Sequence, residues 1–334
     1  MSMKIKDDSA QTSVVKSPSR RYILVKEFNL KVVVPASTSN LGPGFDTLGL
    51  AVNRYMVIES DPADSLHIEV SGEGSAGIPK DENNLVVVAM KKILGEVPRL
   101  SIRIDNGIPE CGGFGASGAA IIGGLLLANE MSGKKFADTD IYNLAIELEG
   151  HPDNVSAALY GGMIVNARNG DGKYSHIKID IGEKLKFAVL LPDNKIETET
   201  ARKLLPSSIT LKEAVTNVQH SSLLVAAIST GNYELIRYAV RDEIHEKHRK
   251  KLIPHFELFN KVALEGGALA FTISGAGSAC IAFCTDHCEG VVDAFAGMIR
   301  GMNLNWRAEM MEPVNKGAEV ASGKFKTVGL GGGK

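Results

Sequence analysis

The 334-residue sequence has little net charge, few cysteines and no long apolar run. Lys and Arg total 37 against 39 for Asp and Glu, so the formal net charge is −2. This balance removes the electrostatic reason to expect nucleic acid or an anionic membrane as a partner. No apolar run approaches the roughly 20 residues that cross a bilayer, and the polar N-terminal stretch lacks the apolar core of a secretory signal. These absences predict a cytoplasmic protein. They do not exclude a local basic pocket that binds a small anion.

The small number of cysteines, four in the whole chain, argues against a disulfide framework. Three of them recur at every fourth position, at Cys280, Cys284 and Cys288. His287 lies beside the last one, which raises the question of a metal site. However, no Cys-x-x-Cys pair or second histidine completes a familiar ligand set. Small buried side chains are therefore the favoured interpretation.

The composition is that of a globular protein, with 44% hydrophobic residues, and strand and helix patterns mix without the steady alternation of a doubly wound sheet. We expect a disordered extension over residues 1–27, a first lobe over 28–185, a second lobe over 186–320 and a flexible tail over 321–334. In the second lobe the order is strand, helix, strand, strand, helix, strand, which is typical of a ferredoxin-like unit. Among the helices, apolar spacing predicts one each over residues 211–229, 233–246 and 256–265.

A glycine-rich segment at residues 109–120 lies between an expected strand and a helix that is expected to begin near Ser117. Glycines let the backbone approach a phosphate closely, and the start of the next helix offers N–H groups and a positive dipole end. The segment is neither a Walker loop nor a Rossmann fingerprint. A tight turn followed by close helix packing explains the glycines equally well, so this segment alone leaves phosphate binding open.

Three further segments combine small and polar residues. Residues 35–49 form an expected loop after the first strand and contain Asn40 and Asp46. Residues 149–154, Glu-Gly-His-Pro-Asp-Asn, join two expected helices, and residues 274–278, Ser-Gly-Ala-Gly-Ser, join two expected strands. Each segment taken alone is explained by helix capping or by turn chemistry.

Together and in this order, the four segments resemble those of the GHMP kinases, which are named for galacto-, homoserine, mevalonate and phosphomevalonate kinases. The resemblance extends from about residue 28 to about residue 320. Residues 35–49 and 149–162 look like the homoserine kinase members, as do the shorter stretches 198–202 and 248–254. The resemblance implies an α+β fold of two lobes, with a ribosomal-protein-S5-like N-terminal lobe and a ferredoxin-like C-terminal lobe. It also implies transfer of a phosphoryl group from ATP to the hydroxyl of L-homoserine, in threonine biosynthesis, with Mg²⁺ as cofactor.

The same resemblance assigns roles to individual residues. ATP would lie on Pro109, Glu110, Cys111, Gly112, Gly113, Phe114, Gly115, Ala116, Ser117, Gly118 and Ala119. Ser117 and Glu149 would hold Mg²⁺, with Glu147 as the fallback because the loop before His151 varies in length within the family. Asn40 would orient the reacting hydroxyl, and Thr198 would approach the transferred phosphoryl group.

The amino-acid substrate would be bound by charged and polar side chains of both lobes. Asp46 would pair with its ammonium group, and Arg202 and Arg249 would take its α-carboxylate, a task suited to planar bidentate donors. His151 and Asn154 would line the pocket.

Two alternatives remain from the sequence. Another GHMP kinase would act on mevalonate, pantoate or a sugar, but these acceptors lack an ammonium group, so an aspartate facing two arginines favours an amino acid. A non-catalytic binding protein of this fold would be expected to lose Ser117 or Glu149, and both are present. The sequence leaves the oligomeric state open, a homodimer included.

Overall fold

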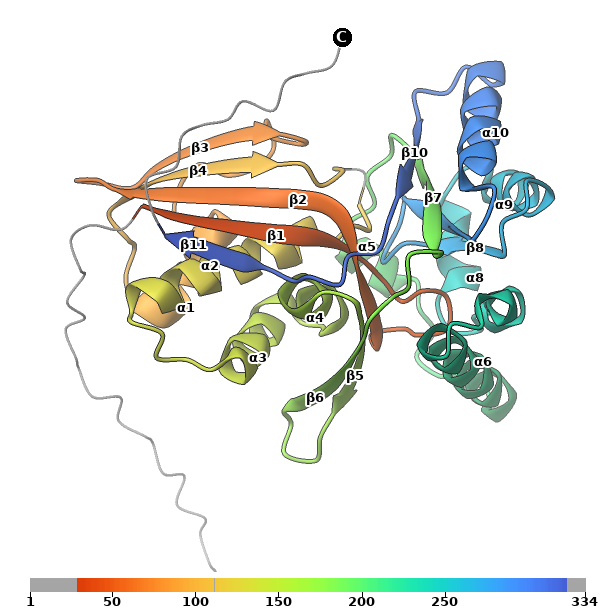
Figure 1. The fold of residues 1–334 in the computed structure, drawn as a ribbon, viewed down its shortest axis with the longest axis horizontal. Helices are drawn as coiled ribbons and strands as arrows, with labels where there is room; N and C mark the ends of the chain where they lie inside the picture. Colours follow the sequence, from red (N-terminus) through yellow and green to blue (C-terminus); the bar gives the residue numbers. More distant parts are fainter. Residues whose placement is uncertain (1–28, 111, 323–334) are drawn as a thin grey trace, which may run out of the picture.

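The computed structural model describes residues 29–110 and 112–322 of the chain. They form a seven-stranded sheet and a four-stranded sheet, each with its own helices (Figure 1). The expected extension over 1–27, Cys111 and residues 323–334 of the expected tail lie outside the described residues. Among the described helices, none is both long enough and apolar enough to cross a membrane.

The first lobe contains the larger sheet, whose strands have the order β11-β1-β2-β4-β3, with β5 paired to β2 and β6 paired to β5. Helices α2 and α4 pack against β1 and β2, and α1 and α3 pack against α2. The elements of this lobe are β1 Leu30–Ser39, β2 Leu48–Pro62, β3 His67–Gly72, α1 Leu85–Leu94, β4 Leu100–Asn106, α2 Ala116–Met131, α3 Asp138–Glu149, α4 Asp153–Tyr160, β5 Met163–Arg168, β6 Tyr174–Ile179 and β11 Glu319–Ser322.

Helix α2 is the central helix of the first lobe because small residues let its neighbours approach closely. A Cβ on Gly124 would lie 2.3 Å from the Val86 carbonyl oxygen of α1, and one on Gly123 would lie 2.3 Å from Ile58 Cδ1 of β2. The apolar residues of the helix are buried almost all round. The glycines therefore fix the depth at which α2 lies, and with it the position of its N-terminus.

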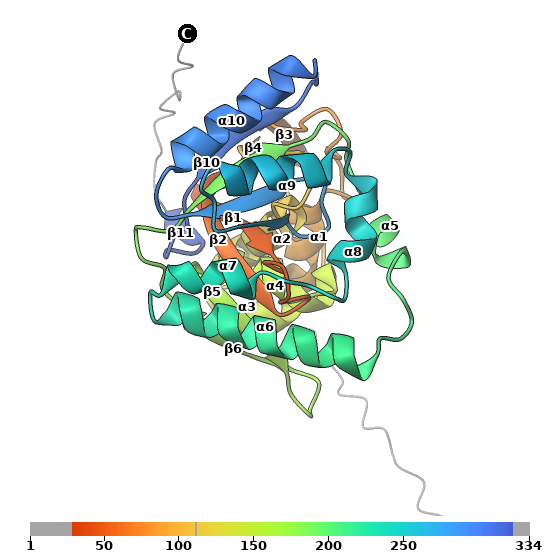
Figure 2. The same cartoon turned by 90° about the vertical axis from the view of Figure 1, so that its right-hand side faces the viewer.

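The second lobe contains the smaller sheet, in the order β10-β7-β9-β8, with all its pairings antiparallel. This order confirms the expected ferredoxin-like unit. Figure 2 shows α9 and α10 beside this sheet, with α6 and α7 next to each other below them. The elements are β7 Lys186–Leu191, α5 Thr198–Lys203, α6 Leu211–Ser229, η1 Tyr233–Leu235, α7 Ile236–Ala239, α8 Glu246–Arg249, η2 Lys250–Leu252, α9 Phe256–Glu265, β8 Ala270–Ile273, β9 Cys280–Cys284, α10 Cys288–Gly301 and β10 Arg307–Met311.

The structure differs from the sequence expectation in the helix predicted over residues 233–246. The chain leaves the helical conformation after Ala239 and restarts at Glu246. The reason is the buried carboxylate of Asp242, which accepts hydrogen bonds from the N–H groups of Ile244, His245 and Glu246. A side chain that binds these N–H groups competes with the continuing helix and starts a new one.

Two further boundaries differ from expectation. The loop expected over 35–49 is shorter in the structure, covering residues 40–47, because β1 continues past a register shift between Pro35 and Ala36 to Ser39 and β2 begins at Leu48. The expected second lobe, 186–320, ends inside β11, which returns to the first sheet and pairs Val320 with Val32 of β1. Long-range pairing of this kind leaves no local signal in the sequence.

Candidate active site

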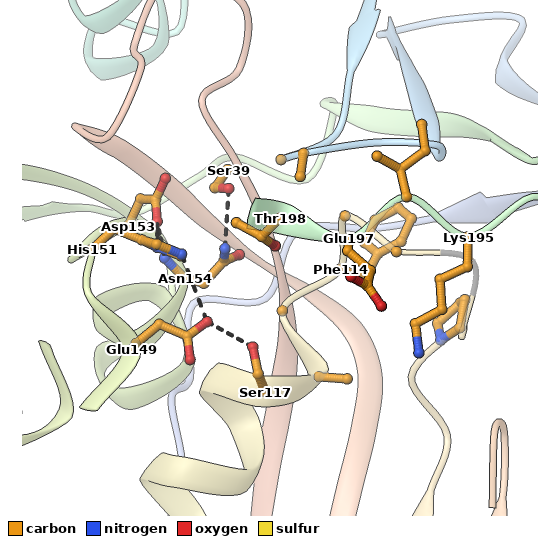
Figure 3. Close-up of a pocket in the computed structure, with 18 of the residues that line it drawn as sticks. Ser39, Phe114, Ser117, Glu149, His151, Asp153, Asn154, Lys195, Glu197 and Thr198 are labelled. Atoms are coloured by element: carbon orange, nitrogen blue, oxygen red, sulfur yellow. Dashed lines mark hydrogen bonds and ion pairs between the residues drawn. The ribbon is translucent and has the colours of Figure 1, made fainter. Parts of the chain in front are cut away.

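A cavity of about 400 Å³ lies between the two lobes and contains most of the predicted site residues (Figure 3). Those that line it are Asn40, Asp46, Pro109, Glu110, Gly112, Gly113, Phe114, Gly115, Ala116, Ser117, Glu149, His151, Asn154, Thr198, Arg202 and Arg249. Gly118 and Ala119 do not line it, because they lie in the packed first turn of α2, where a Cβ on Gly118 would be 3.3 Å from Val155.

The glycine-rich loop is held in a conformation that only glycines adopt readily. Gly112, Gly113 and Gly115 have φ values of 90°, 93° and 66°, in the region that other residues avoid. A Cβ on Gly113 would lie 2.3 Å from the carbonyl oxygen of Ser274, so the loop also touches the second lobe directly. Gly115 is the N-cap of α2 and has no side chain to accept a hydrogen bond. The first N–H groups of α2 are therefore available to an anion such as a phosphate.

Ser117 and Glu149 meet beside this loop. Ser117 Oγ donates to Glu149 Oε1 over 2.6 Å, and Glu149 is the last residue of α3 (Figure 3). Burial raises the pKa of the Glu149 carboxyl above its ordinary value, and the hydrogen bond from Ser117 opposes this. The alternative, Glu147, lies on the surface and pairs with Lys92 over 2.6 Å. A hydroxyl and a carboxylate are the oxygen ligands that Mg²⁺ prefers, and Mg²⁺ commonly takes its remaining ligands from water and substrate phosphates.

His151 is oriented by a carboxylate that sequence reasoning missed. Its Nδ1 lies 2.7 Å from Oδ1 of Asp153, whose side chain is 2% exposed. Burial lowers the pKa of His151, but the hydrogen bond to Asp153 and the charges of Asp153, Glu149 and Asp46 outweigh it, so the pKa is raised. Asp153 lies within the polar segment 149–154, and its place in that segment could have marked it as a site residue.

Asn154 links α4 to β1 in the first lobe. Its Oδ1 accepts from Ser37 Oγ over 2.9 Å, and its Nδ2 donates to Ser39 Oγ over 3.2 Å. These bonds tie the start of α4 to β1. Asn154, a predicted pocket residue, therefore lines the cavity and also holds α4 against β1.

Charged groups of both signs also meet in this cavity. Arg202, in α5, forms two hydrogen bonds to the carboxylate of Asp46, over 2.6 and 3.0 Å. Arg249 is 2% exposed, and its Nη1 donates to the Gly275 carbonyl oxygen over 3.1 Å. The guanidinium carbons of both arginines lie above the ring of Phe45, at 5.4 and 5.2 Å from its centre. Burial and the charge of Arg202 lower the pKa of Arg249 to about 10.

Asn40 stands at the start of the loop that carries Asp46. Its Oδ1 accepts from the Asp46 N–H over 3.1 Å, and its Nδ2 donates to the Gly275 carbonyl oxygen over 2.9 Å. Each of these amide groups has a further hydrogen-bonding site. Asn40 can therefore hold the loop and still contact a ligand in the cavity.

Comparison with known proteins shows to which family the chain belongs. Residues 84–162 match the N-terminal domain of the GHMP kinases, and residues 224–298 match their C-terminal domain. A homoserine kinase from Caldicellulosiruptor bescii is 41% identical over 299 residues, which is 88% of this chain and 97% of the relative. The chain belongs to the GHMP kinase family. A homoserine kinase from Clostridium beijerinckii is 39% identical over 88% of this chain and 99% of the relative.

Solved GHMP kinase structures share the fold. The crystal structure of homoserine kinase from Cytophaga hutchinsonii has a TM-score of 0.78 and 29% identity, and the match covers 90% of this chain and 100% of that one. Mevalonate kinase from Methanococcus jannaschii has a TM-score of 0.61 at 14% identity, over 86% and 99% of the two chains, and shows the shared fold alone. These matches confirm the two-lobed α+β fold.

This GHMP kinase has other cavity residues that the sequence did not mark. Lys195 and Glu197 line the cavity between β7 and α5, in a stretch without a distinctive pattern. The cysteines Cys280, Cys284 and Cys288 lie away from the cavity, in the core of the second lobe. Within the described part of the chain, no group of three His, Cys, Asp or Glu side chains is arranged to hold a metal ion.

Proposed function

We propose that this GHMP kinase transfers the γ-phosphoryl group of ATP to the side-chain hydroxyl of L-homoserine, giving O-phospho-L-homoserine and ADP, a step of threonine biosynthesis. The observation that carries the proposal is that Asp46, Arg202 and Arg249 line the same cavity as the glycine-rich loop. A carboxylate beside two guanidinium groups matches the ammonium and carboxylate groups of a free amino acid. Mevalonate, pantoate and sugars offer no ammonium group to Asp46.

The two ends of the amino acid would be held by different lobes. Asp46, in the first lobe, would bind the ammonium group, and Arg202 and Arg249, in the second, would bind the α-carboxylate. Since Asp46 and Arg202 already contact each other, a zwitterion can contact both through the hydrogen-bonding sites that their mutual bonds leave open. Arg249 is prevented from turning outward by its burial and by its bond to Gly275. The substrate hydroxyl would then point toward Asn40 and the glycine-rich loop.

Phosphoryl transfer passes through a loose transition state, so positioning and charge neutralisation matter more than proton abstraction. Asn40 would orient the attacking hydroxyl. The N–H groups at the start of α2 would hold phosphate oxygens, and Thr198, which lines the cavity at the start of α5, would approach the transferred group. We propose that Ser117 and Glu149 hold Mg²⁺, which neutralises phosphate charge when bound. This arrangement requires no strong general base on the hydroxyl.

The proposal is tested by measuring ADP release with L-homoserine, mevalonate, pantoate and galactose as acceptors. L-homoserine is expected to give the highest kcat/KM, because it alone uses Asp46 and the two arginines together. Preferred turnover of mevalonate, pantoate or galactose would overturn the homoserine assignment and leave the kinase class intact. If none of the acceptors increases ADP release, both the homoserine assignment and the proposed kinase activity are overturned.

A further inference from the structure

The loop that carries Asn40 and Asp46 has a conformation that its own sequence does not favour. Asn40, Leu41 and Asp46 have φ values of 68°, 48° and 51°, in the left-handed region, which asparagine and aspartate tolerate but which strains an apolar residue such as Leu41. Such strain persists only where the surroundings fix the backbone. The contacts that fix this loop therefore determine where its two functional side chains lie.

The first of these contacts comes from His245 in the second lobe. Its side chain is fully buried, and its Nε2 lies 2.8 Å from the carbonyl oxygen of Gly42. Because a carbonyl can only accept, Nε2 carries the proton. The imidazole also stacks on Phe45 of the same loop, with ring centres 5.2 Å apart. His245 thus contacts the loop at two points between Asn40 and Asp46.

The second contact comes from Asn217 in α6. Its Nδ2 donates to the carbonyl oxygen of Pro43 over 3.3 Å and to Asp242 Oδ1 over 2.9 Å. Its Oδ1 accepts from the Glu243 N–H over 2.7 Å, which fixes the orientation of the amide. Two consecutive carbonyls of the loop, Gly42 and Pro43, are therefore bound by side chains of the second lobe.

Asp242 organises both contacts. Its buried carboxylate accepts from Asn217 and from the N–H groups of Ile244, His245 and Glu246, over 3.1, 2.7 and 2.7 Å. The same bonds start α8, which carries Arg249. One carboxylate thus sets the position of both loop contacts and of the helix that bears a proposed substrate-binding arginine.

We propose that His245 and Asn217, oriented by Asp242, are positioning residues for the amino-acid substrate. They hold the carbonyls of Gly42 and Pro43, and through them they place Asp46 for the ammonium group and Asn40 for the hydroxyl. This inference rests on the proposed function for the identity of the substrate. ATP binding does not depend on these contacts, because the glycine-rich loop makes none of them.

The test compares His245→Leu with His245→Gln, since glutamine retains an N–H donor in place of Nε2 and leucine does not. His245→Leu is expected to raise KM for L-homoserine on the order of tenfold, because a buried carbonyl loses its donor and the loop relaxes. KM for ATP should change less than about twofold, and His245→Gln should recover most of the loss. Asn217→Leu is expected to act in the same way through Pro43.

A control separates positioning from a loss of stability. Asn129 makes two comparable hydrogen bonds to the backbone of Phe136, far from the cavity. Asn129→Leu is expected to lower the melting temperature without changing KM for L-homoserine. If His245→Leu and Asn217→Leu also lower only the melting temperature, or raise both KM values equally, the inference is wrong. Should either leucine variant fail to fold, His245→Asn and Asn217→Ser, whose shorter side chains cannot reach the loop carbonyls, are compared with the unmodified enzyme in the same terms.

A double substitution tests the route of the effect. If His245 acts through Asp46, then His245→Leu should cost much less in an Asp46→Asn background than in the unmodified enzyme. Additive effects on KM would contradict the inference. If the unmodified enzyme prefers a different acceptor, the proposed function is wrong. The positioning role is then tested with that acceptor, by measuring whether the substitutions raise its KM and leave KM for ATP unchanged.

Discussion

Asp46 and Arg202 form a bidentate ion pair across the cleft, with Arg202 Nη2 2.6 Å from Asp46 Oδ1 and Nη1 3.0 Å from Oδ2. The pair joins the loop after β1 to α5, so it connects the first lobe with the second. Each side chain remains about one third exposed, at 35% and 36%, and is therefore accessible from the cavity. The hydrogen bond to Asp46 raises the pKa of Arg202, against the effect of burial. The two groups proposed to bind opposite ends of the substrate are thus each other's partner.

Asp46→Asn should weaken binding of the amino acid without affecting ATP. It removes the charge that would face the ammonium group, and a hydrogen bond to a charged group contributes about 1.5–3 kcal/mol. We expect kcat/KM for L-homoserine to fall roughly tenfold to a hundredfold, mainly through KM, while KM for ATP hardly moves. Asp180→Asn, at an exposed carboxylate that pairs with Lys178, serves as the control. An unchanged KM for L-homoserine would remove Asp46 from the substrate site.

Glu149→Gln and Glu147→Gln form a matched pair two positions apart. Glu149 lies in the cavity against Ser117, whereas Glu147 faces the solvent beside Lys92. Loss of a Mg²⁺ ligand should lower kcat by several powers of ten for Glu149→Gln, with the fold intact by circular dichroism. Glu147→Gln should retain nearly full activity. The reverse pattern would move the metal site to Glu147.

Gly113→Ala should damage nucleotide binding by a steric clash. A Cβ at this position would lie 2.3 Å from the carbonyl oxygen of Ser274, so the loop must shift. Gly133→Ala is the matched control, because Gly133 has a similar φ of 82° but no atom within 4 Å of an added Cβ. Steady-state kinetics should show an increase in KM for ATP of about tenfold or more with Gly113→Ala only. Equal effects of the two substitutions would mean that backbone strain, and not the contact with the second lobe, is responsible.

Glu246 should make the stability of the protein depend on pH. Burial raises the pKa of its carboxyl to about 7, although Thr272 Oγ1 and the Ile273 N–H donate to it. Because the folded pKa lies above the ordinary value, the folded state favours the protonated form. The contribution of the Glu246 carboxyl to the free energy of unfolding is fully present below about pH 4.5 and is lost as the pH rises through about 7.

Glu246→Gln imitates the protonated form and should remove this loss. Relative to the unmodified protein, the free energy of unfolding of the variant should rise by about 2.5 kcal/mol between pH 5 and pH 8. Denaturant unfolding at both pH values measures the difference, and the exposed Glu257→Gln is the control. A difference that does not vary with pH would show that Glu246 has an ordinary pKa in the folded protein.

The sequence alone determined the features that depend on neighbouring residues. Apolar spacing located α6 and α9 at their observed bounds, because an amphipathic helix is encoded by local periodicity. The strand and helix order of the second lobe predicted its ferredoxin-like sheet for the same reason. The resemblance of the glycine-rich loop and the polar segments to those of the GHMP kinases predicted most of the residues that line the cavity.

Tertiary structure alone decided what depends on contacts between distant segments. The burial of Arg249, the return of β11 to β1 and the hydrogen bond between Ser117 and Glu149 each depend on a partner far away in the sequence. The helical pattern over residues 233–246 is interrupted because a buried Asp242 carboxylate is satisfied by the backbone after it and by Asn217, whose amide also reaches Pro43. Local periodicity cannot reveal this, because the free energy of burying a charge is set by the groups that surround it in the folded chain.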